Sequence, residues 1–180
     1  MKGSFKEFIK NIIPVIAGIL IALFINNWNE NRKDKVYIDK FYSSLKKELE
    51  QTDKEITDKT PYQQSLVDSL DYYLDDDDVS LMDIIDKVQG VKEPGIKLNY
   101  WKALSNSKIE LIDYEKLSIL SDIEEGNELL KYKRNNLLDF IYSNMTETGK
   151  NEKLKMKFMM MEIMNTQMST QEDIRKILNE

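Results

Sequence analysis

The sequence predicts an all-α protein in which an N-terminal transmembrane helix continues into a long helix, followed by an irregular helical bundle. Three observations favour this class. Residues 12–25 form an uninterrupted apolar run. The polar remainder places apolar side chains at the three- and four-residue spacing of amphipathic helices. Helix-capping sequences and isolated Pro or Gly residues, which mark helix ends, lie between these stretches.

The apolar run has 14 residues and covers about 21 Å as a helix, against a hydrocarbon core of about 30 Å. Extension to Phe8 and Trp28 gives 21 residues and about 31 Å, with Lys10 able to reach the headgroups and Trp28 at the interface. The run has no polar face, which disfavours a surface helix. The residues predicted in the membrane are Ile12, Ile13, Val15, Ile16, Gly18, Ile19, Leu20, Ile21, Ala22, Leu23, Phe24 and Ile25, and those at its interface are Lys10, Trp28, Arg32 and Lys33.

A cleaved signal peptide and a buried or interfacial helix are the alternatives to an uncleaved span. Lys2, Lys6 and Lys10 resemble the charged start of a signal peptide, but the small residues of a cleavage site are missing after Ile25. Basic residues flank the run almost equally, so the positive-inside rule decides little. We predict a signal anchor that leaves the N-terminus inside and the C-terminal domain outside the cytoplasm. Gly18 and Ala22 either allow helix pairing or simply face lipid.

The segment Gly-Ile-Leu-Ile-Ala-Leu-Phe-Ile-Asn-Asn-Trp-Asn-Glu-Asn-Arg-Lys, residues 18–33, resembles the hallmark of a family of small bacterial single-pass membrane proteins of unknown function. Weaker similarity follows at residues 45–50 and 101–112, where Lys108 stands at a position that holds Gly in the family. The resemblance implies a helical protein anchored in the bacterial inner membrane. It supplies no catalytic residues.

Composition divides the 180-residue chain into two parts. The net charge is −6, and residues 1–33 hold five Lys or Arg against two Asp or Glu, so residues 34–180 carry −9. We predict a membrane anchor with its juxtamembrane segment over 1–33 and an acidic helical domain over 34–180. An acidic domain repels nucleic acid. Cys and His are both absent, which excludes thiolate and imidazole catalysis, disulfides and zinc sites built from these residues. No cofactor is expected.

A heptad-like seam follows the anchor. Nothing between Asn26 and Lys59 is Gly or Pro, so one helix is expected to run from the membrane to about residue 59. Its seam either forms a homo-oligomeric coiled coil or packs on later helices of the same chain. Thr60, Pro61 and Gln63 match a capping box with Pro at the first helical position, so a second helix is expected to begin there. The seam residues are Ile38, Tyr42, Leu45, Leu49, Thr52 and Ile56.

The second helix is expected to end at the aspartates of residues 75–78. Four adjacent carboxylates either bind Ca²⁺ or form a solvated loop, and the EF-hand pattern is absent. Ser80 and Asp83 then form a capping box for a short helix that stops at Gly90. Residues 90–98 are predicted to be a loop.

Residues 99–107 are predicted to form a short helix that carries Trp101, either a core residue or a ligand platform. Asp113 can cap the next helix, which continues to about residue 145 and contains Gly126, a residue that weakens helices.

The helix before it is expected to end at Gly149, and the last helix is expected from about Asn151 to Leu178. Residues 169–172 form another capping box, so the last helix is expected to break and restart there. Its dense methionines form either an adaptable binding groove or an irregular core, with Lys153, Lys155 and Lys157 on the polar side. The residues predicted to mediate interactions are Ile38, Tyr42, Leu45, Leu49, Met160 and Met164.

These features predict a non-enzymatic interaction, scaffold or sensor module. Its expected partners are the lipid bilayer and either a second copy of the chain or another membrane protein. The alternative is a carboxylate-based enzyme or a divalent-cation-binding bundle at the membrane, because carboxylates are the main acid-base groups available.

Overall fold

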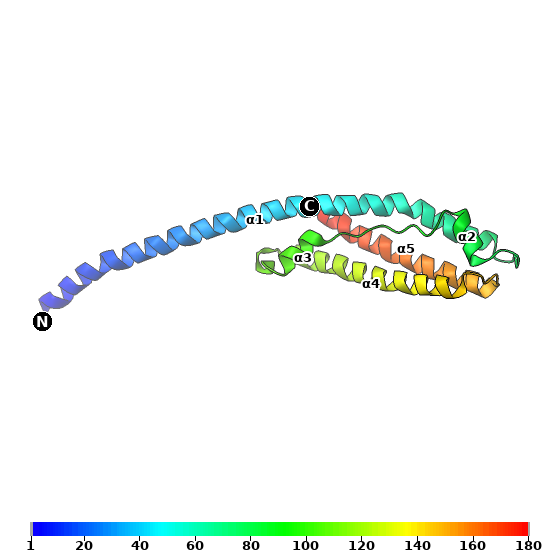
Figure 1. Ribbon diagram of the computed structural model, residues 1–180. Helices are drawn as coiled ribbons and strands as arrows, with labels where there is room; N and C mark the ends of the chain where they lie inside the picture. Colours follow the sequence, from blue (N-terminus) through cyan, green and yellow to red (C-terminus); the bar gives the residue numbers. More distant parts are fainter. Residues whose placement is uncertain (1, 180) are drawn as a thin grey trace. The chain divides into compact units, whose positions relative to one another are not determined.

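The protein is all-helical. The computed structural model describes residues 2–179, with side chains described for Phe8 and for residues 10–179. Within this range the secondary structure is helix and turn without strands, which confirms the predicted fold class. The elements are α1 Lys2–Tyr72, α2 Leu81–Lys87, α3 Asn99–Ser105, a 3-10 helix η1 Ile109–Leu111, α4 Tyr114–Asn144 and α5 Lys150–Leu178 (Figure 1).

The chain divides into two units, the first ending at Ser43 and the second beginning at Ser44. Helix α1 contributes to both, because it continues from Lys2 to Tyr72. The predicted continuity of the apolar run with the helix that follows it is therefore confirmed. An 18-residue window of this helix has a mean hydropathy of 1.8, and none of it is buried in the protein. The helix is long and apolar enough to cross a membrane.

The second unit is built on three long helices: α4, α5 and the part of α1 from Ser44 onward. Helices α4 and α5 lie side by side (Figure 1), and the Lys133 amine joins them by donating to the Glu162 carboxylate at 2.9 Å. Helix α5 also contacts α1: the Gln171 amide donates to the Thr57 hydroxyl, and the Lys157 amine donates to the Asp71 carboxylate. Since these partner numbers rise along α1 as they fall along α5, α1 and α5 are antiparallel.

The interior of this unit combines aliphatic residues, methionines and several amides. The main apolar cluster consists of Leu66, Val67, Leu70, Leu81, Ile84, Ile85, Leu130, Leu137, Ile141, Met156, Met160 and Ile163. Buried amides come from each of the three long helices: Gln63, Asn127, Gln167 and Gln171. Among the described residues, the Gln63 side chain has no hydrogen-bond partner. The core is therefore polar in part, which the apolar periodicity of the sequence does not indicate.

Most predicted helix ends are confirmed by their caps. Ser80 and Asp83 form the predicted capping box of α2, and the Ser80 hydrogen bonds lower the pKa of the Asp83 carboxyl. Gly90 follows α2 with φ +90°, a conformation that favours glycine. The Asp113 carboxylate accepts the N–H of Glu115 at the start of α4. Gly149, predicted to end the preceding helix, is instead the N-cap of α5, and α4 ends at Asn144.

The predicted break at Thr60 and Pro61 is wrong, since α1 continues to Tyr72. The Thr60 hydroxyl donates to the Ile56 carbonyl at 2.8 Å instead of capping a new helix, and Gln63 is buried. A proline inside a helix removes one hydrogen bond and destabilises it by about 3 kcal/mol. Contacts with α5 on both sides of Pro61, at Thr57 and farther along, hold the helix together.

Two predictions about α5 are also wrong. The helix does not restart at residues 169–172, because Gln171 is buried and its amide donates to the Asp53 carbonyl, the Asp53 carboxylate and the Thr57 hydroxyl. Lys153 is not on the polar side but fully buried. Its amine donates to the carbonyls of Tyr73, at 2.9 Å, and Asp76, at 2.5 Å, which lie just after α1.

Candidate functional site

The first candidate site is the apolar segment of α1 in the first unit. Its large side chains are exposed on every side of the helix, from 36% at Ile12 to 73% at Phe24. Such exposure of consecutive Ile, Leu and Phe side chains in water is strongly unfavourable. The segment, which contains all twelve residues predicted to lie in the membrane, therefore requires an apolar surrounding. An added Cβ at Gly18 would have nothing within 4 Å, so this face is open too.

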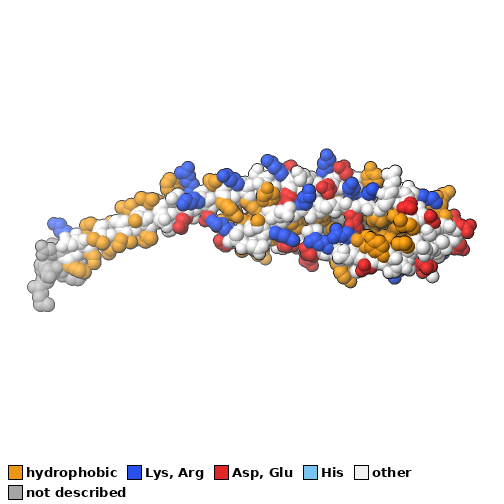
Figure 2. Space-filling view, viewed as in Figure 1, with side chains coloured by type: hydrophobic (Ala, Val, Ile, Leu, Met, Phe, Trp, Pro, Cys, Tyr) orange, Lys and Arg blue, Asp and Glu red, His pale blue; other side chains and the backbone are white. Residues whose placement is uncertain are grey.

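The predicted interface residues flank the apolar segment. Lys10, Trp28, Arg32 and Lys33 are all exposed on the same helix. Arg32 and Lys33, with Asn29 and Val36, line a shallow surface hollow. Figure 2 shows that hydrophobic side chains dominate the surface of the N-terminal helix, whereas Lys, Arg, Asp and Glu are spread over the bundle among polar and hydrophobic patches. Charged side chains therefore flank the apolar segment, with Lys10 before it and Arg32 and Lys33 after it.

The residues predicted to mediate interactions do not form one surface. Leu45, Leu49 and Met160 are fully buried in the second unit, and Met160 belongs to its main apolar cluster. These three residues pack in the chain's own core. This agrees with the alternatives given above, that the seam packs on later helices of the same chain and that the methionines fill an irregular core. Ile38, Tyr42 and Met164 are partly exposed. Trp101 is a core residue whose indole N–H donates to the Glu124 carboxylate at 2.6 Å.

The aspartates of residues 75–78 form a turn with partners inside the chain. Asp75 pairs with Lys150 at 2.6 Å, and the Asp76 carboxylate accepts the N–H of Asp78. Four other carboxylates, Asp122, Glu125, Glu162 and Asp173, line an open groove between α4 and α5. Glu162 is paired there with Lys133 and Asp173 with Lys176. No group of three or more carboxylates among the described residues has a geometry that could hold a metal ion.

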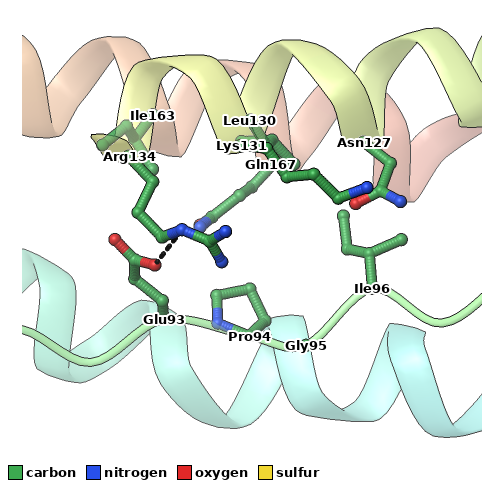
Figure 3. A pocket seen from close by; sticks show the side chains of 10 residues that line it. All are labelled: Glu93, Pro94, Gly95, Ile96, Asn127, Leu130, Lys131, Arg134, Ile163 and Gln167. Atoms are coloured by element: carbon green, nitrogen blue, oxygen red, sulfur yellow. Dashed lines mark ion pairs between the residues drawn. The ribbon is translucent and has the colours of Figure 1, made fainter. Parts of the chain in front are cut away.

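The second candidate site is a cavity of about 140 Å³ between the α2–α3 loop and helices α4 and α5, here called the loop cavity. One extended segment of the loop forms a wall (Figure 3). The lining residues are Glu93, Pro94, Gly95 and Ile96 from the loop, Asn127, Leu130, Lys131 and Arg134 from α4, and Ile163 and Gln167 from α5.

Helix α1 fixes the loop in this position. Three of its side chains, spaced by about one turn, accept hydrogen bonds from backbone N–H groups of the extended loop and of the start of α3. These side chains take the place of the neighbouring strand that an extended segment would otherwise pair with. The acceptor and donor pairs are Glu55 with Gly95 at 2.8 Å, Thr52 with Lys97 at 3.4 Å, and Glu48 with Asn99 and Tyr100, both at 3.1 Å. The cavity wall is thus held by side chains rather than by a regular element.

The loop cavity contains two cations and one partly buried acid. The Arg134 Nε lies 3.7 Å from the Glu93 carboxylate, and the Lys131 amine pairs with Glu128 at 2.6 Å. Burial raises the pKa of the Glu93 carboxyl, and the positive charge of Arg134 partly opposes this. In Figure 3 the two terminal nitrogens of Arg134 point away from Glu93 and toward Pro94.

The cavity has no signal in the sequence as a whole. Glu93 and Gln167 are far apart in the chain, and an isolated Lys131 or Arg134 on a helix gives no signal of convergence. The only local indication was the loop itself, which the Pro and Gly residues of 90–98 predicted. Comparison with known protein families, curated proteins and solved structures finds nothing that matches this chain.

Proposed function

We propose that this protein is a non-enzymatic, single-pass module of the bacterial inner membrane, in which α1 anchors an acidic helical bundle that binds a partner protein. The observation that carries the proposal is the exposure of residues 12–25 on every side of α1. A soluble protein would cover such a segment, and a lipid bilayer supplies the apolar surrounding that it needs.

The free energy of insertion supports a membrane rather than an aqueous location. The segment contains ten Ile, Leu, Val or Phe residues, each contributing about −0.3 to −0.6 kcal/mol on the insertion scale, or about −3 to −6 kcal/mol together. One arginine near the centre costs about 3 kcal/mol, and two cost about 6 kcal/mol. Two arginines should therefore prevent insertion, whereas one leaves it close to balance.

Alkaline carbonate extraction of membranes tests the anchor. We expect the wild-type chain to stay in the membrane pellet with its N-terminal segment intact by mass spectrometry. The Ile16→Arg/Leu20→Arg variant, with both arginines near the centre of the segment, should move to the soluble fraction. Tyr132→Arg/Tyr142→Arg, which places the same charges on exposed positions of the bundle, is the matched control and should stay in the pellet. Wild-type chain in the supernatant, or a product that begins after the apolar segment, would refute the anchor.

Labelling of single cysteines tests the orientation, because the chain contains no native cysteine. Lys10 and Ser121 are exposed on the two sides of the apolar segment in sequence. If the bundle lies outside the cytoplasm, an impermeant maleimide should label Ser121→Cys in intact cells and Lys10→Cys only after permeabilisation. The reverse pattern would overturn the orientation. Chemical crosslinking and affinity purification from membranes in mild detergent then test the partner: a chain recovered only as an unbound monomer would contradict the interaction role.

A further inference from the structure

We propose that the loop cavity binds a small monocarboxylate with a short apolar body. The inference uses only residues of the second unit, so it stands or falls separately from the membrane anchor. It rests on three features of the cavity: a guanidinium with an unused face, two amides that line the cavity with no hydrogen-bond partner among the described residues, and a size and charge that suit a small monoanion.

The guanidinium of Arg134 offers a fork for a carboxylate. Its Nε faces Glu93 at 3.7 Å, a distance too long for a hydrogen bond. The terminal nitrogens point to the other side, along the loop at Pro94 (Figure 3). A carboxylate can accept two parallel N–H bonds from such a pair, which is a strong and geometrically specific interaction.

Two buried amides face the cavity from helices α4 and α5. Asn127 is 6% exposed and Gln167 is 3% exposed, and both line the cavity. Neither side-chain amide forms a hydrogen bond with the part of the chain that the structure describes. Because both amides line an open cavity, water can bind them in the free protein, and a ligand can take the place of that water. A ligand carrying a carboxylate oxygen or a polar substituent would satisfy them.

Size and charge restrict the ligand further. A volume of about 140 Å³ corresponds to four or five water molecules at about 30 Å³ each, enough for a small organic acid. The side chains of Leu130, Ile163 and Ile96 supply apolar wall for its carbon chain. The carboxylates of Glu93 and Glu128 balance the charges of Arg134 and Lys131, so a dianion such as phosphate meets repulsion that a monocarboxylate largely avoids.

Isothermal titration of the full chain in mild detergent tests the proposal. The probes are sodium formate, acetate, propionate and butyrate, with sodium chloride and sodium phosphate at equal ionic strength as comparisons. We expect dissociation constants of about 1 mM for ligands of so few atoms, so titration extends to about 50 mM. We expect saturable binding of at least one carboxylate, and weaker binding of phosphate.

Three variants connect binding to the cavity. Arg134→Lys keeps the charge but loses the fork, and should weaken binding at least tenfold. Glu93→Gln removes a repelling carboxylate and should strengthen binding several-fold. Arg175→Lys makes the same exchange at an exposed ion pair with Asp53 outside the cavity, and should leave binding unchanged. Arg134 is substantially exposed, so its replacement by Lys should not unfold the bundle, and circular dichroism can verify this.

The proposal is overturned by any of three results. These are no saturable binding of any carboxylate beyond that of chloride, tighter binding of phosphate than of every carboxylate, and equal carboxylate affinity in Arg134→Lys and wild type. Carbonate extraction of the same preparations reports on the membrane anchor, so failure of the cavity and failure of the anchor give different results.

Discussion

Replacement of Gly126 by alanine should destabilise the bundle, although alanine is the better helix former. Gly126 lies in the middle of α4, opposite Thr170 of α5. A Cβ at this position would lie 2.3 Å from the Thr170 hydroxyl oxygen and 3.3 Å from its Cβ. Thr170 is buried, and its hydroxyl donates to the Thr166 carbonyl at 2.9 Å. The hydroxyl cannot move aside without losing this bond.

The magnitude follows from three contributions. Alanine stabilises a helix interior by about 0.9 kcal/mol relative to glycine. Overpacking of a well-packed interior destabilises by about 1–3 kcal/mol, and loss of the Thr170 hydrogen bond by about 1 kcal/mol. The free energy of unfolding should therefore fall by about 1–3 kcal/mol in Gly126→Ala. In a Thr170→Ala background the clashing oxygen is absent, so the same glycine replacement should raise the free energy of unfolding by about 0.5–1 kcal/mol.

Trp101 fluorescence can follow this transition in guanidinium chloride. The chain has two tryptophans, of which Trp101 is buried and Trp28 is exposed, so Trp28→Phe makes Trp101 the only indole reporter. The four members of the Gly126 and Thr170 cycle are compared in this background. Asn135→Ala, on the exposed side of α4, controls for helix propensity and should stabilise slightly.

The double-mutant cycle at Gly126 and Thr170 can refute the predicted steric clash between α4 and α5. We expect a coupling free energy of about 2–3 kcal/mol between the two positions, with alanine at position 126 destabilising the Thr170 protein and stabilising the Thr170→Ala protein. A coupling below about 0.5 kcal/mol would mean that α4 and α5 do not approach closely at Gly126. Stabilisation by Gly126→Ala in the wild-type background would lead to the same conclusion.

Three further predictions concern hydrogen bonds and one partly buried acid. Trp101→Phe removes the 2.6 Å indole bond to Glu124 and should lower the free energy of unfolding, measured by circular dichroism, by about 2 kcal/mol. Ser80→Ala removes the capping box of α2 and should lower it by about 1 kcal/mol in the same measurement. Because burial raises the pKa of Glu93 in the fold, its stabilising contribution is present at low pH and is lost as pH rises through that pKa. Glu93→Gln should therefore stabilise the bundle near pH 7 by less than about 1 kcal/mol, and denaturant titrations should show this advantage disappearing below about pH 4.

The sequence could predict most helix ends because their causes are local. The Ser80 and Asp83 side chains bond to backbone groups three residues away, and Asp113 does the same two residues away. Gly90 adopts a positive φ three residues after the last residue of α2, Lys87. The exposed apolar segment of α1 is also a local feature, since every residue from Ile12 to Ile25 is apolar whichever way the helix faces.

The failures have long-range causes. Pro61 and Gln63 carry a valid helix-start pattern, yet packing against α5 keeps α1 continuous. Lys153 is charged, and spacing alone assigned it to the polar side. Its amine nevertheless reaches carbonyl groups that lie almost 80 positions earlier in the chain. Local pattern cannot reveal such partners, because the benefit of each contact exists only after the helices have docked.

The loop cavity depends most on long-range contacts. Its extended wall has no strand partner, and α1 side chains replace that partner by accepting the loop's N–H groups, from Glu55 to Glu48. These α1 side chains lie at residues 48–55, before Pro61, and the same part of α1 is bonded to α5 through Asp53 and Gln171. The cavity, with Arg134 and Gln167 opposite the loop, therefore forms only after α1, α4 and α5 have docked.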